Sequence, residues 1–98
     1  MEASIAIQVV PNVDGEEKMI SVVDKVIEYI SSTGLNYQVG AFETSIEGDF
    51  DELMEVAKQC QLVAIKAGTP SVSTNIKVVY KPEGDVLSIE KKTKKHQH

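Results

Sequence analysis

The stretch from Val39 to Leu53, V-G-A-F-E-T-S-I-E-G-D-F-D-E-L, constrains the fold more than any other part of the chain. Gly40 and Gly48 mark turns, since glycine adopts backbone angles that other residues avoid. Residues 43–47 between them alternate in polarity, as a half-buried strand does. Asp49 with Glu52 three residues later is typical of a capped helix start. The stretch therefore predicts two strands in a hairpin that lead directly into a helix.

The remaining elements follow from periodicity. Residues 4–10 alternate as a strand, and Pro11 ends it. Residues 14–34 carry an apolar stripe of helical spacing, with Asp14 as the expected cap and Gly34 as the stop. A short strand covers residues 35–39, the second helix runs from 49 to a stop at 68, and a long strand covers 71–80. Residues 86–95 fit either a short strand or a short helix capped by Asp85, and the sequence does not decide between them.

The order strand, helix, strand, strand, helix, strand predicts an α+β, ferredoxin-like βαββαβ fold with a short C-terminal segment. In this topology a four-stranded antiparallel sheet has spatial order 4-1-3-2, and both helices cover one face. Ninety-eight residues suit one domain, which we assign to residues 1–90. Residues 91–98 hold four of the ten lysines and no acid, and are predicted to form a flexible basic tail.

Charge and composition narrow the function. The formal charge is −5, and the acids all lie before the basic tail. An acidic body argues against nucleic acid as a partner and favours cationic ligands. No apolar run is long enough for a membrane span, and the start M-E-A-S-I-A lacks the basic residues of a signal peptide, so we expect a cytoplasmic protein without a membrane partner.

Catalytic and metal signatures are missing from the sequence. Both histidines lie in the tail, so no Ser/His/Asp or Cys/His set is available, and there is no C-x-x-C, phosphate-binding loop or arginine. Cys60 lies on the apolar stripe of the second helix and is predicted to be a buried packing thiol. Glu43 and Glu47 are two carboxylates on one side of a strand, which are more often surface charges than an acid–base pair.

The face of the sheet away from the helices is the predicted functional surface. The apolar sides of the long strands must pack against the helices, because apolar burial stabilises the fold there. The opposite face then collects a set of polar side chains from the four strands. This mixed face favours a ligand site or a self-association surface over plain solvent exposure. Its predicted members are Gln8, Glu43, Ser45, Ser73, Asn75 and Lys77, with Tyr37 and Val39 or their neighbours.

Several segments resemble a known family: S-I-A-I-Q-V-V-P, V-I-E-Y-I-S-S-T-G-L-N-Y-Q-V-G, A-F-E-T-S-I-E-G-D-F-D-E-L-M and V-V-Y-K-P-E-G-D-V-L-S-I-E-K-K. Together they are similar to the thiamine-binding-like family of small bacterial and archaeal proteins. The resemblance spans nearly the whole chain, and Y-x-V-G followed by T-x-x-E-G-D is fairly specific. It implies a ferredoxin-like fold, homo-oligomers built by packing sheets, often tetramers, and no established catalysis.

The resemblance also implies a ligand, because some members bind thiamine or its hydroxymethylpyrimidine moiety. A cationic thiazolium suits the acidic body, and Tyr37 or Phe42 could stack on either ring. By analogy the site lies around Gly40, Phe42, Glu43, Thr44 and Ser45, and the open face adds Gln8 and Asn75.

Three functions remain open at this point. The first is non-catalytic binding of thiamine or a hydroxymethylpyrimidine-like molecule by a homodimer or homotetramer formed through the open sheet face, with no cofactor or metal beyond that ligand. The second is a structural or regulatory oligomeric module without such a ligand. The third is an enzyme acting on a pyrimidine through Glu43 or Glu47.

Overall fold

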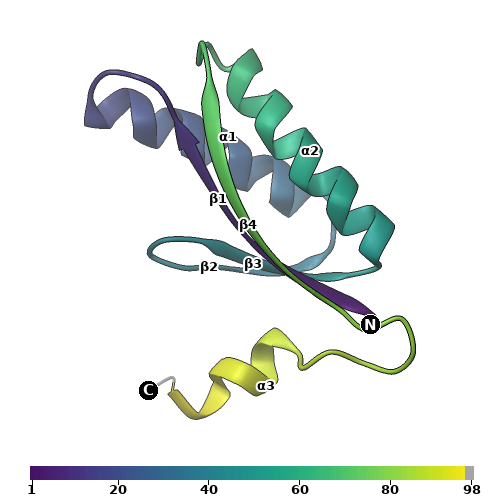
Figure 1. The fold of residues 1–98 in the computed structure, drawn as a ribbon. Coiled ribbons are helices and arrows are strands. Elements are labelled where there is room, and N and C mark those ends of the chain that lie inside the picture. The colour runs from purple at the N-terminus through teal and green to yellow at the C-terminus, as the bar shows by residue number, and fades with distance from the viewer. Residues whose placement is uncertain (97–98) are drawn as a thin grey trace.

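The computed structural model describes residues 1–96, which fold into one sheet with helices on both sides (Figure 1). The elements follow the predicted order, and a short C-terminal helix is added. Their bounds are β1 Ala3–Pro11, α1 Glu16–Ser32, β2 Asn36–Val39, β3 Thr44–Gly48, α2 Phe50–Lys66, β4 Val72–Tyr80, α3 Ile89–Thr93 and the 3₁₀ turn η1 Lys94–His96.

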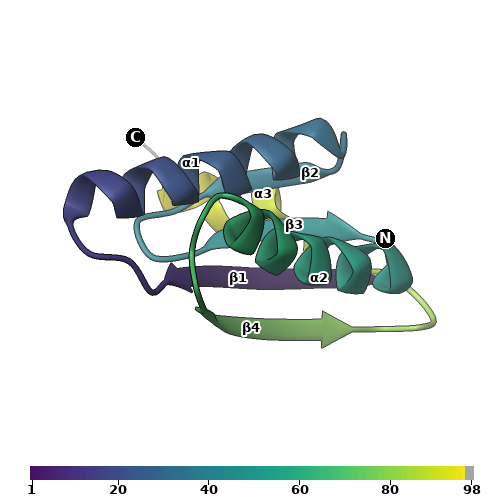
Figure 2. The same ribbon diagram turned by 90° about the horizontal axis from the view of Figure 1, so that it is seen from above.

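The sheet has the order β2-β3-β1-β4 with every neighbouring pair antiparallel, which confirms the predicted topology. In Figure 2 β1 lies inside the sheet and β4 is its outermost strand on one side. β1 pairs with β4 along its whole length and with β3 over Ala3–Ile7. The last residues of β1 therefore extend past the end of β3, and this difference in length shapes the site described below.

Helices α1 and α2 pack on the same face of the sheet, as predicted (Figure 1). The core between these two layers is apolar, and its innermost members are almost fully buried. Cys60 lies in this core with no exposed surface, so its predicted role as a packing thiol is confirmed. The largest of the fully buried core side chains are Ile5, Ile30, Ile46, Leu53 and Val22.

The two helices end at the predicted glycines, but the predicted side-chain caps at their starts do not form. Gly34 and Gly68 follow the helix ends with φ of 77° and 105°, angles that favour glycine. Asp14 is not the cap of α1: Gly15 occupies that position, and neither α1 nor α2 has a side-chain cap. Asp49 does occupy the cap position of α2, but the predicted capping box does not form.

The C-terminal segment resolves the alternative left open by the sequence. It forms helix α3, whose cap is Ser88 and not Asp85, and the Ser88 hydroxyl accepts a hydrogen bond from the Lys91 amide. Asp85 instead pairs with the N-terminal ammonium group of Met1. Helical structure continues to His96, into the segment predicted as a tail, and residues 97–98 of that segment lie outside the described residues.

Helix α3 lies on the face of the sheet opposite α1 and α2 (Figure 1). Glu47 holds it there: one carboxylate oxygen accepts from the Ile89 amide at 2.8 Å and the other from the Asn36 amide group at 2.5 Å. Glu47 and the neighbouring Ser4 are buried as a result. The open face predicted from the sequence is thus covered at one corner, and the rest of it stays accessible.

Candidate functional site

A cleft lies between α1 and the end of β1, where the sheet is incomplete. β3 stops pairing with β1 at Ile7, and the chain turns through residues 40–43 at that point. The odd-numbered residues of β1 direct their backbone groups toward β3, since Ala3, Ile5 and Ile7 are paired there. Val9 continues this series with no β3 residue opposite it. Its amide and carbonyl are therefore placed at the cleft as a free donor and acceptor.

The β2–β3 hairpin closes one side of this cleft. The Gly40 amide donates to the Glu43 carbonyl at 2.9 Å, which tightens the turn. A Cβ at position 40 would lie 2.8 Å from the same carbonyl oxygen, so the close approach requires glycine. The turn projects Phe42 into solvent, with 82% of the residue exposed.

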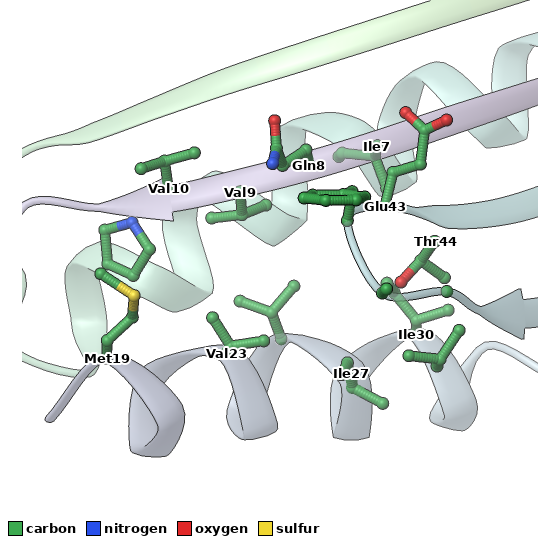
Figure 3. A pocket seen from close by; sticks show the side chains of 16 residues that line it. Ile7, Gln8, Val9, Val10, Met19, Val23, Ile27, Ile30, Glu43 and Thr44 are labelled. Atoms are coloured by element: carbon green, nitrogen blue, oxygen red, sulfur yellow. The ribbon is translucent and has the colours of Figure 1, made fainter. Parts of the chain in front are cut away.

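The cleft is small and mostly apolar (Figure 3). Its volume is about 290 Å3. Met19, Val23 and Ile27 of α1 rise toward Val9 of β1, and Thr44 lies at one end. Gln8 and Glu43 border it but point to the other side of β1 (Figure 3). This arrangement can enclose one flat ring and leave a charged group at the rim.

A second, shallower hollow lies on the open face, on the other side of the same turn. It is lined by Gln8, Phe42, Glu43, Asn75 and Lys77, with Ile76. The Asn75 amide group donates to the Gln8 side-chain oxygen at 3.0 Å, and the Lys77 ammonium lies 3.3 Å from a Glu43 oxygen. The two hollows share Gln8, Phe42 and Glu43, so the turn forms the wall between them.

Most of the predicted site residues gather around this turn. Gln8, Gly40, Phe42, Glu43 and Thr44 line the cleft, and Asn75 joins the hollow on the open face. Ser45 lies on the open face opposite Ala6. Thr44, opposite Ile7, is buried on the helix side.

Tyr37 does not join this group. Its partner in the hairpin is Ile46, a core residue, so its side chain lies on the helix face. Its neighbours Asn36 and Gln38 lie on the open face instead, opposite Glu47 and Ser45. The prediction that Tyr37 and Val39 lie on the open face is therefore wrong. The alternative prediction, that their neighbours in β2 lie there, is confirmed.

Glu47 does not reach the cleft. Glu43 lies in the turn before β3, whereas Glu47 is buried within β3 and bonded to α3 and Asn36. Its two oxygens are both occupied by structural hydrogen bonds. This leaves Glu43 as the carboxylate at the rim of the cleft.

The apolar wall of the cleft was missed as part of the site. Met19, Val23 and Ile27 follow a four-residue spacing and belong to the apolar stripe of residues 14–34, which predicts a buried helix face. The buried residues of α1 are Val22, Val26 and Ile30. The residues that line the cleft lie beside this buried row, at the edge of the apolar stripe, and this position is the signal that could have identified them.

No helix within residues 1–96 is long and apolar enough to cross a membrane. Over the same residues, no group of three or more histidine, cysteine and acidic side chains is placed to hold a metal ion.

Comparison with known proteins places these features in context. A family model described as "Thiamine-binding protein" matches residues 5–97. A UPF0045 protein of Clostridium perfringens is 37% identical over 94 residues, which is 96% of each chain. Among solved structures, a Bacillus cereus domain of unknown function is 37% identical with a TM-score of 0.87, and the match covers 99% of this chain and 91% of that one.

A further solved structure has a name that refers to thiamine. It is a Thermotoga maritima protein described as a candidate for thiamine biosynthesis or salvage. It is 31% identical to this chain with a TM-score of 0.85, and the match covers 99% of this chain and all of that one.

Proposed function

The chain belongs to the thiamine-binding protein family, and we propose that it binds thiamine or a hydroxymethylpyrimidine-like molecule without changing it chemically. The observation that carries this proposal is the apolar cleft beside the turn 40–43, which has a free backbone donor and acceptor at Val9 and a carboxylate at its rim. We place this binding in the cytoplasm, as the sequence predicts.

The size of the cleft supports a ring and not a whole cofactor inside it. Pockets for drug-sized ligands span about 300–1,000 Å3, and the volume of about 290 Å3 falls at the lower limit. An aminopyrimidine presents a ring nitrogen and an amino group side by side. The Val9 amide and carbonyl, or the Thr44 hydroxyl, are suitable partners for these two groups.

The rim supports a positive charge on the remainder of the ligand. Glu43 is half-buried there, and the exposed ring of Phe42 is next to it. A thiazolium ring is attracted both to a carboxylate and to an aromatic face. With no arginine in the chain, we expect thiamine to bind better than its pyrophosphate, which adds negative charge near Glu43.

We also propose that the protein self-associates through the open face as a homodimer or homotetramer. α3 covers one corner of this face, and the accessible part carries Ala6, Val10 and Val79 among polar side chains. Exposed apolar residues on a sheet face favour a protein contact over solvent. The alternative function, an oligomeric module without a ligand, depends on this surface alone.

The test is a thermal-shift and calorimetric titration with thiamine, hydroxymethylpyrimidine and thiamine pyrophosphate. A ligand at about 100 times its dissociation constant adds about 2.7 kcal/mol to the stability of the native state. We expect a shift with the first two. Val23→Phe should abolish it by filling the cleft, whereas Ile20→Phe, on the same helix outside the cleft, should leave it intact.

The result separates the candidate functions. No heat and no shift with a folded protein at millimolar ligand would overturn the binding proposal and favour the oligomeric module. Binding that survives Val23→Phe but is lost in Glu43→Gln would move the ligand to the hollow on the open face. Turnover of a bound pyrimidine that disappears in Glu43→Gln would instead support an enzyme.

A further inference from the structure

The hollow on the open face is larger than the cleft and differs from it in chemical character. Its volume is about 620 Å3, against about 290 Å3 for the cleft. Pockets for drug-sized ligands span about 300–1,000 Å3, so the hollow has room for a fused ring system and the cleft for a single ring. Gln8 and Glu43, which border both, point to the other side of β1 from the cleft, where the hollow lies (Figure 3).

Two carboxamide side chains form the polar part of this hollow. Gln8 of β1 and Asn75 of β4 are directly opposed in the sheet, and the Asn75 amide group donates to the Gln8 oxygen at 3.0 Å. The reciprocal bond, from the Gln8 amide group to the Asn75 oxygen, does not form, and within residues 1–96 neither of these groups bonds elsewhere. A donor and an acceptor therefore remain side by side. Exchanging the oxygen and nitrogen of both amides would leave the same pair of functions.

This pair of functions fits a planar molecule that carries an acceptor beside a donor. Adenine is such a molecule, because a ring nitrogen lies next to its amino group, and asparagine and glutamine side chains recognise it through these two positions. The ring nitrogen can accept from the Gln8 amide group while the amino group donates to the Asn75 oxygen. A single aminopyrimidine ring carries the same two groups, but the size of the hollow favours the fused rings.

Phe42 offers such a molecule a flat apolar surface. The residue is 82% exposed, although it lines the hollow. Proteins that bind unpaired bases stack them on aromatic side chains, because every base has a π-face. The turn holds Phe42 in place, since the Gly40 amide and the Glu43 carbonyl on either side of it are hydrogen-bonded at 2.9 Å. A base stacked on Phe42 removes an exposed apolar ring from water.

The charges around the hollow favour an uncharged ligand. Lys77 is the one cation that lines it, and its ammonium lies 3.3 Å from the Glu43 carboxylate, so the two charges offset each other. The chain has no arginine, the side chain best suited to hold a phosphate through two hydrogen bonds. Its formal net charge of −5 repels a phosphorylated molecule. A free base or a nucleoside therefore suits the hollow better than a nucleotide.

We propose that the open-face hollow is a second ligand site, which binds a neutral purine of the adenine type as a free base or a nucleoside. The base stacks on Phe42, and Gln8 and Asn75 form hydrogen bonds with its amino edge. This function goes beyond the binding of thiamine in the cleft and does not depend on it. The turn 40–43 separates the two sites, so each ligand can be tested alone and in the presence of the other.

Calorimetric titration of the full chain with adenosine tests the site. Purine riboside has the same rings without the amino group, and it should bind about fivefold more weakly because one hydrogen bond is lost. Adenine should bind as adenosine does. AMP should bind more weakly than adenosine, and the difference should be greater at low salt, where the negative charge of the protein is less screened.

Two substitutions in the hollow should weaken adenosine binding. Asn75→Ala removes the acceptor and Phe42→Ala removes the stacking surface, and we expect a loss of about fivefold or more from each. Both residues are exposed, so the variants should fold, which circular dichroism checks. Asn12→Ala is the matched control, because it removes an exposed carboxamide outside the hollow. Val23→Phe distinguishes the two sites, since it should abolish thiamine binding and keep adenosine binding.

Three outcomes would overturn the proposal. The first is a folded protein that gives no heat with adenosine at millimolar concentration, as it would if a second copy covered the hollow. The second is adenosine binding that survives both Asn75→Ala and Phe42→Ala. The third is adenosine that competes with thiamine and is lost in Val23→Phe, which would place it in the cleft. Thiamine binding can fail by itself in the same titrations without changing these results.

Discussion

The two faces of the sheet differ in what occupies them and in how completely they are closed. The helix-covered face meets α1 and α2 in a core whose central side chains are almost fully buried. The opposite face carries polar side chains, and α3 covers one corner of it through Glu47. The first arrangement accounts for the stability of the domain, because apolar burial is the main favourable term in folding.

The comparison also shows where the covered face fails to close. β1 extends past the last residue of β3, so α1 faces an incomplete sheet there and the cleft remains. β4 extends past the cover of α2, so its apolar edge stays exposed. The proposed contact with a small ring lies where the helix layer and the sheet differ in extent. Three predictions test the contrast between the two faces, and a fourth sharpens it.

The largest expected effect is on the covered face. Leu53→Ala removes a fully buried side chain from the centre of the core, and such a change leaves a cavity that costs about 2–5 kcal/mol. Leu87→Ala is the matched control, because Leu87 is exposed. Chemical denaturation should show the large loss for Leu53 and a change within about 0.5 kcal/mol for Leu87. Equal losses would contradict the assignment of the core.

The next expected effect is a pH dependence of the free energy of unfolding, which comes from Cys60 in the same core. Burial raises the pKa of the Cys60 thiol from its ordinary 9.0 to about 11. Below pH 9 the thiol is protonated in both states, so it adds no pH dependence. Between pH 9 and 11 the unfolded chain loses this proton while the native protein keeps it, so the free energy of unfolding falls with rising pH, by at most about 2.7 kcal/mol.

Cys60→Ala isolates this contribution from the other groups that titrate at high pH. We expect the stability of the wild-type protein to fall more steeply than that of the variant between pH 9 and 11. A thiol reagent should also react slowly with the native protein at pH 8, since the thiolate is the reactive form. Parallel stability curves and fast labelling would show that Cys60 is accessible.

The open face should respond locally when α3 is released. Glu47→Gln keeps the shape of the side chain but replaces one acceptor oxygen by an NH2 group, which cannot accept from the Ile89 amide and the Asn36 side chain together. Loss of a buried, charged hydrogen bond costs about 1–3 kcal/mol. Hydrogen exchange should accelerate in α3 while the central strands stay protected. Glu90→Gln, an exposed residue of α3, is the control.

Much of the fold could be predicted because its signals are local. The alternation of residues 4–10 and the apolar stripes of the two helices each lie within one element, and the stops at Gly34 and Gly68 depend on one backbone angle each. The C-terminal segment was harder to assign. Its helix depends on Glu47, which is 42 residues away in the chain from Ile89.

The site was predicted in part for the same reason. Gly40, Phe42, Glu43 and Thr44 are consecutive or nearly so, and the hairpin brings them together. Tyr37 was placed on the wrong face because N-Y-Q-V is too short for its alternation to fix a face, which is set by pairing with β3. The cleft itself depends on where β3 stops pairing with β1, which no local pattern encodes.

The smallest expected effect concerns the charge pair on the open face. Lys77 and Glu43 are 3.3 Å apart, and the Lys77 side chain is largely exposed. Such a pair contributes about 0.2–1 kcal/mol, so Lys77→Met should change the stability within this range, far less than Leu53→Ala.

The substitution also leaves the Glu43 carboxylate without its competing cation. Thiamine affinity should therefore rise, by at most about fivefold for 1 kcal/mol, and more at low salt than at high salt. Lys25→Met on the outer side of α1 removes the same charge far from the turn and should change neither quantity. A fall in affinity for Lys77→Met alone would mean that Lys77 contacts the ligand and that the open-face hollow, and not the cleft, holds it.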